Sequence, residues 1–459
     1  MGNGHPARSS TPRLVAALVC VLLVMIVLFF GWRRDGKCDL ESQDPKITAL
    51  DLKGCGLTEL SPIILRFQRL QKLDLGGNAL RTLPTLPPSL EILFLLDNLF
   101  EHVPKSVSRL PRLRMLSFKG CRLRELARLP ASLTWLILTG NRLTWIPRHL
   151  DNLTGVRKLM LSNNQLRAVP PGIRHMKDLE LLRLANNEIK NLPDWLYALP
   201  KLTWLALAGN PVVAPAPARS TLADVQPKEL TLSDRLGEGT SSIVYRALWR
   251  GQTVAVKQYK AELSSDGRNI DEVRASCAVD HPHVLRFLGY YTSPRLVALL
   301  EWAPGLHSLG KPPSLETITR DTYAPGSSYG TDFVKTLALS IAKAGQHLHS
   351  VGLSHGDLYA HNILVNPQTG EAKLADFGAA FYYGGPSAPH AADYEAMELR
   401  AYGLLLLELI DRHDGQGMTA PGASERLAAL QSLATVCSAD AAERPKGFTG
   451  ALQLLERIQ

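Results

Sequence analysis

The segment that decides the fold is residues 355–378, which read HGDLYAHNILVNPQTGEAKLADFG. Asp357 stands five residues before Asn362, and Asp376 opens an Asp-Phe-Gly triplet after an apolar interval that is typical of a strand. Ordinary turns are the simplest interpretation, because Gly and Asp favour turns. Three oxygen-bearing side chains on loops also meet the needs of phosphoryl transfer, which requires an oriented nucleophile and metal ions between phosphates.

The order and spacing of these residues resemble the catalytic loop and the Asp-Phe-Gly motif of the protein kinase family. The resemblance implies that Asp357 accepts or orients the proton of the acceptor hydroxyl. It also implies that Asn362 and Asp376 hold Mg²⁺, or Mn²⁺, beside the phosphates of ATP. The cofactors expected from the resemblance are therefore ATP and a divalent metal ion.

The catalytic loop departs from the family pattern at two positions. Gly356 replaces the Arg of His-Arg-Asp, so a phosphate on the activation segment lacks its usual partner and control by its phosphorylation is not expected. Tyr359 replaces the Lys that serine/threonine kinases carry two residues after the Asp, which removes a cation near the transferred phosphoryl group. His361 stands where tyrosine kinases place an Arg, and it could substitute in part when protonated.

The nucleotide half of the resemblance lies upstream. Gly237 and Gly239 sit between two alternating apolar segments, and Ser242 takes the place of the third Gly of the family's phosphate-binding loop. Lys257 follows on a predicted strand, and the resemblance pairs it with Glu272, so both join Asp357 as expected catalytic residues. Leu300 matches the gatekeeper, ahead of a hinge that contains Trp302. The residues expected to contact ATP are Leu236, Gly237, Glu238, Gly239, Thr240, Ser241, Ser242, Val244, Ala255, Lys257, Glu301 and Ala303.

Beyond Gly378 the pattern loosens. Glu398 matches the Asp that begins a conserved helix of the family, and Arg444-Pro445 matches a C-terminal Arg-Pro. Only 19 residues separate Gly378 from Glu398, and they contain no clear Ala-Pro-Glu. We therefore expect a short and atypical activation segment.

Residues 47–212 contain a repeated LxxLxLxxNxL pattern. Eight units begin at Ile47, Leu70, Leu90, Leu113, Leu133, Val156, Leu179 and Leu202, at intervals of 20 or 23 residues. The pattern resembles the leucine-rich repeat family, in which each unit supplies a short strand whose leucines are buried by the neighbouring units. Cys55 and Cys121 replace the Asn in two units, and we expect them to be small buried substitutes.

The repeats are expected to bind a protein or peptide. Alternate side chains of each strand point away from the leucine core, so they should line the concave face. The large apolar residues at these positions are Ile92, Phe94, Leu96, Met115, Trp135, Ile137 and Met160. We expect Phe94 and Trp135 to anchor the partner, unless the kinase-like part of the chain covers the face. Lys119 and Lys158 are the nearest cations, so a nucleic-acid partner is not expected.

Residues 14–32 form a run of 19 residues without charge, which predicts a transmembrane helix rather than a cleaved signal peptide, because no small-residue cleavage site follows. An ATP-dependent activity would place the repeats and the kinase-like domain together on the cytoplasmic side. The six cysteines include no close pair, which argues against a disulfide framework and favours a reducing compartment. Residues 1–212 carry a net charge of +13, from 29 basic and 16 acidic residues, whereas residues 213–459 carry −4.

Together these observations predict a multidomain chain of the α/β and α+β classes. The expected parts are a transmembrane helix (14–32), a solenoid of leucine-rich repeats (47–212), a linker (213–228) and a bilobal kinase-like domain (229–459). The expected function is a membrane-anchored protein kinase that transfers the γ-phosphate of MgATP to a Ser or Thr hydroxyl, or to Tyr, of a protein substrate. Two alternatives stay open: a pseudokinase scaffold that signals by docking, and a small-molecule phosphotransferase, because relatives of that class also contain His-Gly-Asp.

Overall fold

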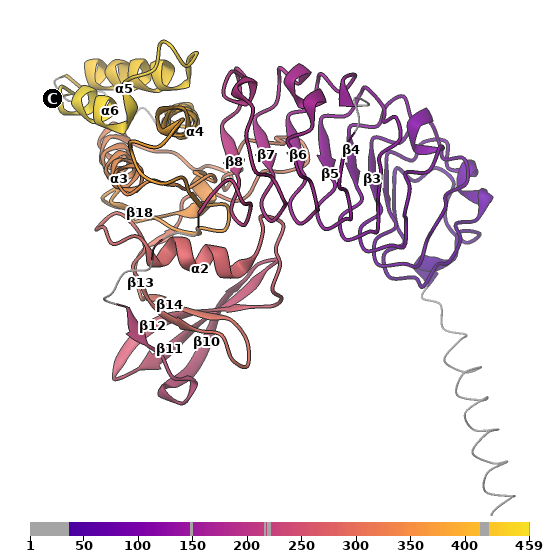
Figure 1. Cartoon of the computed structure of the whole chain (residues 1–459), viewed down its shortest axis with the longest axis horizontal. Coiled ribbons are helices and arrows are strands. Elements are labelled where there is room, and N and C mark those ends of the chain that lie inside the picture. The colour runs from indigo at the N-terminus through magenta and orange to yellow at the C-terminus, as the bar shows by residue number, and fades with distance from the viewer. Residues whose placement is uncertain (1–35, 147–149, 215–216, 218–221, 414–421, 459) are drawn as a thin grey trace, which may run out of the picture.

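A computed structural model describes residues 36–146, 150–214, 217, 222–413 and 422–458. Figure 1 shows a curved stack of short strands that meets, at its β8 end, a unit with a sheet-rich lobe and a helical lobe.

The stack is one parallel sheet of eight strands in sequence order. Each strand is three residues long and centres on a Leu that neighbouring units bury, which is why the repeat period creates the sheet. The strands are β1 (Ala49–Asp51), β2 (Lys72–Asp74), β3 (Ile92–Phe94), β4 (Met115–Ser117), β5 (Trp135–Ile137), β6 (Lys158–Met160), β7 (Leu181–Arg183) and β8 (Trp204–Ala206). Short 3-10 helices on the other side of several turns include η2 (Pro62–Arg66), η3 (Val107–Arg109), η5 (Pro171–His175) and η6 (Asp194–Leu196).

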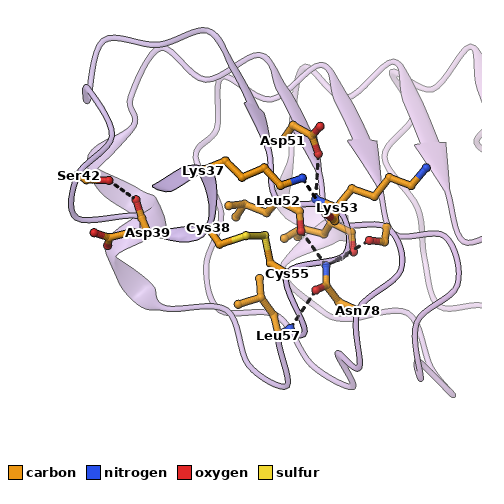
Figure 2. Close-up of a disulfide and its surroundings, with 12 residues drawn as sticks. Lys37, Cys38, Asp39, Ser42, Asp51, Leu52, Lys53, Cys55, Leu57 and Asn78 are labelled. Atoms are coloured by element: carbon orange, nitrogen blue, oxygen red, sulfur yellow. Dashed lines mark hydrogen bonds between the residues drawn. A yellow bond between two sulfur atoms is a disulfide. The ribbon is translucent and has the colours of Figure 1, made fainter. Parts of the chain in front are cut away.

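The repeated Asn holds each turn. Asn78 donates from Nδ2 to the carbonyls of Leu75 (2.8 Å) and Leu52 (3.0 Å), and its Oδ1 accepts from the backbone N–H of Leu57 at 2.9 Å (Figure 2). Buried backbone groups need such partners, since leaving one unpaired is costly. The repeated Asn therefore supplies hydrogen-bond partners to the backbone of the turns, which the leucine side chains cannot do.

A disulfide joins Cys38 to Cys55, and the expectation of a chain without disulfides is wrong for this pair (Figure 2). The 3-10 helix η1 (Gly36–Cys38) precedes the first repeat and brings Cys38 to a Cα–Cα distance of 5.7 Å from Cys55. A spacing of 17 residues gave no sign of this approach, because the first repeat brings the two together in space. Cysteine usage thus no longer favours a reducing compartment. Cys121 is buried as expected, and its thiol contacts the carbonyl of Leu95 at 3.2 Å.

The sheet-rich lobe contains a six-stranded sheet in the order β10-β11-β12-β14-β13-β9. The long antiparallel strands arise from alternating apolar segments that are rich in β-branched residues. Within residues 213–228, β9 pairs in parallel with β13, and η7 (Pro227–Glu229) follows it. The elements are β9 (Ala223–Asp224), β10 (Leu230–Glu238), β11 (Ser242–Trp249), β12 (Gln252–Tyr259), α2 (Asn269–Cys277), β13 (Phe287–Tyr291) and β14 (Val297–Glu301).

The helical lobe is built on α3 (Thr331–Ser350), α4 (Ala391–Ile410), α5 (Ala423–Ser438) and α6 (Gly447–Glu456). Their apolar residues form one buried cluster around Leu406, Tyr402 and Phe448. Short strands carry the loops of interest beside α3. They are β15 (His307–Ser308), β16 (Leu353–Ser354), β17 (Ile363–Val365), β18 (Ala372–Leu374) and β19 (Phe381–Tyr382), with η8 (Ala360–Asn362) between β16 and β17.

The two parts share their cores. Leu181 and Trp204 of the repeats belong to the cluster of the helical lobe, and Phe381, Tyr394 and Met397 of that lobe belong to the cluster of the repeats. Contacts of this kind bury apolar surface that either part alone would expose. The repeats and the helical lobe therefore form one packed unit.

The prediction of a transmembrane helix is corrected. Within the described part of the chain, no helix is both long and apolar enough to cross a bilayer. The longest helices, α3 and α4, have 20 residues each, but both carry charged side chains, such as Lys335 and Lys343 in α3 and Glu398 and Arg400 in α4. Charged groups at mid-bilayer depth are costly. The expected span, residues 14–32, lies outside the described residues, and the single-pass membrane localisation is withdrawn with it.

Candidate functional site

The glycine-rich loop is the turn between β10 and β11. Gly239 closes it with a backbone hydrogen bond to the carbonyl of Ser242 at 2.9 Å, and the turn residues between them are Thr240 and Ser241. A Cβ added at Gly237 would meet no atom within 4 Å, so no neighbour covers this backbone. Lys260 donates to the carbonyl of Gly239 at 2.8 Å. The loop thus leaves open space beside Gly237 at the tip of the sheet.

Lys257 and Glu272 form a buried ion pair. The ammonium of Lys257, on β12, lies 2.5 Å from Oε1 of Glu272, on α2. Its second acceptor is Oδ1 of Asp376 at 3.4 Å. Burial lowers the pKa of Lys257, but the carboxylates of Asp376 and Glu272 outweigh burial, so its pKa lies above the ordinary value. The ammonium therefore stays charged and joins both lobes.

Asp376 and Asn362 present the oxygens that a metal needs. The Lys257 ammonium holds the pKa of Asp376 below its ordinary value, so this carboxylate is ionised. The side chain of Asp376 is 51% exposed, and its backbone has a φ of 59°, a conformation that residues other than Gly rarely adopt. Asn362 is buried and donates from Nδ2 to the carbonyl and to Oδ2 of Asp357, both at 2.9 Å.

These donors fit Mg²⁺ together with ATP. Magnesium prefers one or two protein oxygens plus phosphate oxygens. Asp376 offers a charged carboxylate, and the hydrogen bonds of Asn362 use its nitrogen, so that its amide oxygen would be the atom to bind a metal ion. No cluster of three His, Cys, Asp or Glu within the described ranges could hold an ion alone, so the phosphates would have to complete the site.

Asp357 lies in the loop between β16 and η8, where polar contacts fix the backbone. Glu398 of α4, itself buried, accepts from the N–H of Gly356 at 2.7 Å and pairs with His349 at 2.8 Å. His355 bonds the carbonyl of Ala375 at 3.0 Å through its Nε2 atom, which links the loop to the strand before Asp376. These contacts set the spacing between the two acidic side chains.

The repeats also reach this loop. Arg183, the last residue of β7, is 3% exposed, and its Nη2 donates to Oδ1 of Asp357. Its Nη1 donates to the carbonyl of Gly356 at 2.8 Å, and its Nε to Asp266 at 2.9 Å. Burial raises the pKa of Asp357, but the Arg183 guanidinium, followed by His361 and His355, holds it below the ordinary value.

Sequence reasoning missed Arg183. An Arg at the third position of a repeat strand looks like one more surface charge among the many of residues 1–212. The only possible sign was the loss of the usual Arg and Lys around Asp357, which indicates that a charge must come from elsewhere. Nothing in a one-dimensional pattern points from that loss to a residue 174 positions earlier.

Gly356 and Tyr359, the two residues at which the catalytic loop departs from the family pattern, both contact the repeats. Gly356 has a φ of 69°, and a Cβ there would lie 2.4 Å from the carbonyl oxygen of Leu205 and 2.8 Å from that of Ala379. The ring of Tyr359 stacks on Trp204 of β8 with a centroid distance of 4.2 Å. Trp204 also donates from Nε1 to the carbonyl of Leu358 at 3.1 Å.

His361, expected to substitute for a missing cation, is paired elsewhere. Its Nδ1 lies 2.8 Å from Asp321, whose side chain is fully buried. Burial lowers the pKa of His361, but Asp321 and Asp357 outweigh burial and place it above the ordinary value. The imidazolium charge is therefore largely balanced by Asp321.

The short activation segment packs on the repeats and on the helical lobe. Within it, β19 pairs with β16, and Phe381 enters the repeat core. The ring of His390 stacks on Tyr197 of the repeats at 3.9 Å, and the hydroxyl of Tyr197 bonds that of Tyr394 at 2.9 Å. Apolar packing, ring stacking and a hydrogen bond between two tyrosines hold this segment against the repeats.

The remaining expected nucleotide residues lie on the strands of the sheet-rich lobe and in the turn after β14. Ala255 pairs in register with Leu300 on the neighbouring strand, and Val244 pairs with Lys257. Leu236 is 43% exposed on β10. The carboxylate of Glu301 is already engaged, because it accepts hydrogen bonds from Lys373 at 2.7 Å and from the N–H of Arg286 at 2.9 Å. Glu238 pairs with Lys260, and Ala303 begins the turn after β14.

The expected partner face of the repeats is less open than the sequence indicated. Met115 is buried, and Met160 packs against the core of the helical lobe. The ammonium of Lys158 lies 4.1 Å from the ring centroid of Trp135, and that of Lys72 lies 5.9 Å from the ring of Phe94. The other expected partner residues, Ile92, Leu96 and Ile137, are half-buried.

Comparison with known proteins agrees with this geometry. Residues 230–397 match the protein kinase domain family, and residues 154–212 match the leucine rich repeat family. A probable serine/threonine-protein kinase of Dictyostelium discoideum is 27% identical over 202 residues, which cover 39% of this chain and 21% of that protein. The probable serine/threonine-protein kinase drkC of the same organism is 29% identical over 168 residues, covering 34% and 21%.

The chain thus spans about a fifth of the length of these curated relatives. The matched segments contain the glycine-rich loop, the Lys257–Glu272 pair and the Asp357 loop on one side, and the last repeats, with Arg183, on the other. The resemblance found in the sequence is therefore confirmed for these two regions: the chain contains a leucine rich repeat region, followed by a region that matches the protein kinase domain.

Proposed function

We propose that the chain transfers the γ-phosphate of MgATP to a Ser or Thr hydroxyl of a protein. The observation that carries the proposal is the assembled set of Lys257, Glu272 and Asp376, joined by ion pairs of 2.5 and 3.4 Å across the two lobes. Phosphoryl transfer depends mainly on such positioned charges. The names of the two relatives support serine or threonine as the acceptor.

In this reaction Asp357 accepts the proton of the acceptor hydroxyl. The hydroxyl oxygen forms a bond to the γ-phosphorus, and the bond from that phosphorus to the bridging oxygen breaks, so that the electron pair leaves with ADP. Asp376 and Asn362 would hold the metal ion, which supplies charge neutralisation between the phosphates. Lys257 would orient the phosphates, while Glu272 holds its ammonium in place.

Radiolabel transfer tests the proposal. The purified chain is incubated with [γ-³²P]ATP and Mg²⁺ or Mn²⁺, together with casein or histone, and labelled protein is hydrolysed to identify the phosphoamino acid. We expect phosphoserine or phosphothreonine, and a Lys257→Met variant should lose about tenfold or more of the activity. Label only in phosphotyrosine would reject the acceptor class. No protein label at all would favour the docking scaffold, and label in a small-molecule acceptor would favour the other phosphotransferase class.

We also propose that the repeats bind a protein through the part of the concave face that lies away from the kinase domain. Phe94 and Trp135 would be its anchors, because each is a half-buried aromatic ring on a neighbouring part of one sheet. Lys72 lies over the ring of Phe94, which favours an acidic peptide with an apolar side chain.

A photo-crosslinking residue at position 92 identifies the partner, and a purified fragment of it then gives a Kd. Replacing Phe94 and Trp135 with Ser should raise that Kd by about tenfold or more. Arg167→Ser serves as the control, because its side chain is 79% exposed outside this face. Equal Kd values for the double variant and the control would reject the face.

A further inference from the structure

The guanidinium of Arg183 lies against the carboxylate of Asp357. The catalytic loop itself lacks the cation that the family places near this Asp. Tyr359 occupies the place of the usual Lys, and its ring is committed to stacking on Trp204. Arg183 donates to Asp357 and, at 2.8 Å, to the carbonyl of Gly356. A positive charge is therefore present beside Asp357, but it comes from the seventh repeat.

The junction is shaped for this approach. Three alanines, Ala185 and Ala206 of the repeats and Ala379 of the activation segment, form a small buried cluster where the two parts meet. Larger side chains at these positions would separate the backbones. Gly356 is required there too, because any Cβ would collide with the carbonyl oxygen of Leu205. The close approach of the repeats to the catalytic loop thus leaves no room for an Arg at position 356. The same approach brings Arg183 within hydrogen-bond distance of Asp357.

The contact is buried in the fold. Arg183 and Trp204 are 3% and 2% exposed, and each part of the chain contributes residues to the other's core. Asp266, in the loop before α2, anchors the Arg183 Nε at 2.9 Å. An arginine that is fixed by three acceptors is held in one orientation, as a positioning group must be.

The rest of the centre stays assembled while the repeats are docked. Lys257 still pairs with Glu272, and the side chain of Asp376 is 51% exposed. The repeats also contact the loop before α2, since Asn163 donates to the carbonyl of Ser264 at 2.7 Å. A contact that served only to switch the site off would not need to preserve this arrangement.

We propose that Arg183 is a positioning residue of the phosphoryl-transfer centre, which the repeats supply in place of the cation missing at position 359. It fixes one oxygen of Asp357, while Asn362 fixes the other. The inference rests on the proposed kinase activity and adds that the repeats are part of the active site. Removal of the repeats would therefore remove a component of the centre.

Steady-state kinetics of the full chain test the inference. Arg183→Met should lower kcat by roughly tenfold or more while the KM for ATP stays near that of the wild type, because the nucleotide contacts are on other residues. Arg183→Lys should recover much of the loss, since it restores the charge with one donor group. Guanidinium chloride at millimolar concentration should partly rescue Arg183→Ala by filling the vacated space.

Two further variants separate this role from a purely structural one. Arg157→Met is the matched control, because Arg157 pairs with Glu180 at 2.9 Å in the same junction but does not contact the catalytic loop. Its kcat should match the wild type. Arg183→Met combined with Asp266→Asn removes the carboxylate that the single change leaves unpaired, so a loss of kcat in this folded double variant cannot come from that charge.

The outcomes are distinct. An increase of kcat in Arg183→Met would overturn the inference and identify an inhibitory contact. Equal losses in Arg157→Met and Arg183→Met, without rescue by Lys or guanidinium, would reduce Arg183 to a structural residue. Absence of transfer by the wild type and by every variant would overturn the kinase proposal itself, and the assignment of Arg183 with it.

Discussion

Arg183, in the seventh repeat, donates a hydrogen bond to the carboxylate of Asp357, 174 residues further along the chain. The contact places a side chain of the repeats at the residue that the kinase domain would use to accept a proton. The repeats therefore contact the proposed catalytic residue directly.

Trp204→Ala should destabilise the whole unit. Trp204 is buried between the repeats and the helical lobe, stacks on Tyr359 and donates to Leu358. Truncating a buried Trp costs about 3–5 kcal/mol. Urea denaturation followed by circular dichroism should show a lower midpoint in one cooperative transition. Trp145→Ala, at a side chain that is 54% exposed, should leave the midpoint unchanged. Two separate transitions in the wild type would mean that the cores are not shared.

Asp376→Asn should weaken MgADP binding more than it weakens the binding of metal-free ADP. The carboxylate is the charged oxygen of the proposed metal site, and the Lys257 ammonium keeps it ionised. Isothermal titration calorimetry with and without Mg²⁺ measures the difference. The Mg²⁺-dependent part of the affinity should fall by about tenfold or more. An identical loss under both conditions would show that Asp376 supports the fold rather than the metal.

Stability should decrease as pH rises through neutrality because of Glu408. Burial raises the pKa of this carboxyl to about 7, although the hydrogen bond from Tyr323 opposes the shift. The folded state thus holds a proton that the unfolded state releases from about pH 5 upward, so the stabilising contribution is complete at low pH and is lost as pH approaches 7 and above. At pH 8, Glu408→Gln should be more stable than the wild type by about 1–3 kcal/mol.

The comparison is made by urea denaturation at pH 5 and pH 8. At pH 5 the two proteins should be close, because the protonated carboxyl resembles the amide. Glu456→Gln, at an exposed position, is the control and should show no such pH dependence. If the stability difference between Glu408→Gln and the wild type were the same at pH 8 as at pH 5, the raised pKa of the Glu408 carboxyl would be rejected.

Reduction of the Cys38–Cys55 disulfide should loosen the first repeat. The bond closes a loop of 17 residues, and a loop of that size contributes about 3 kcal/mol in the chain-entropy description. Hydrogen exchange with mass spectrometry should show faster exchange in β1 after dithiothreitol treatment, while β7 and β8 stay protected. Thiol labelling that finds both cysteines reactive without a reductant would contradict the bond.

The sequence predicted the elements whose signals are local. The period of the leucines predicted the strands of the repeats, because each strand is built from its own LxL triplet. The order of Lys257, Asp357 and Asp376 similarly predicted a kinase domain. Arg183 and the stacking of Trp204 on Tyr359 could not be predicted, since they depend on how two parts pack after folding. The disulfide was missed for the same reason.

A one-dimensional pattern could not show which surfaces the other part of the chain covers. The alternation of side chains predicted an open apolar face, but Met160 is covered by the helical lobe, which approaches that end of the sheet. In the sequence, Gly356 and Tyr359 are departures that remove an Arg and a Lys, and in the structure both residues also contact the repeats. Departures from a family pattern can therefore mark a contact as well as a defect.

The most direct test of the central claim is the single-turnover rate of phosphoryl transfer by Asp357→Asn at saturating MgATP. A general base contributes about 10²- to 10⁴-fold, so the rate should fall by that factor while the Kd of MgADP changes little. Asp178→Asn, at a half-exposed residue that pairs with Lys201, should keep the wild-type rate. If Asp357→Asn transferred phosphate as fast as the wild type, Asp357 would not be the acceptor of the proton and the proposed centre would be wrong.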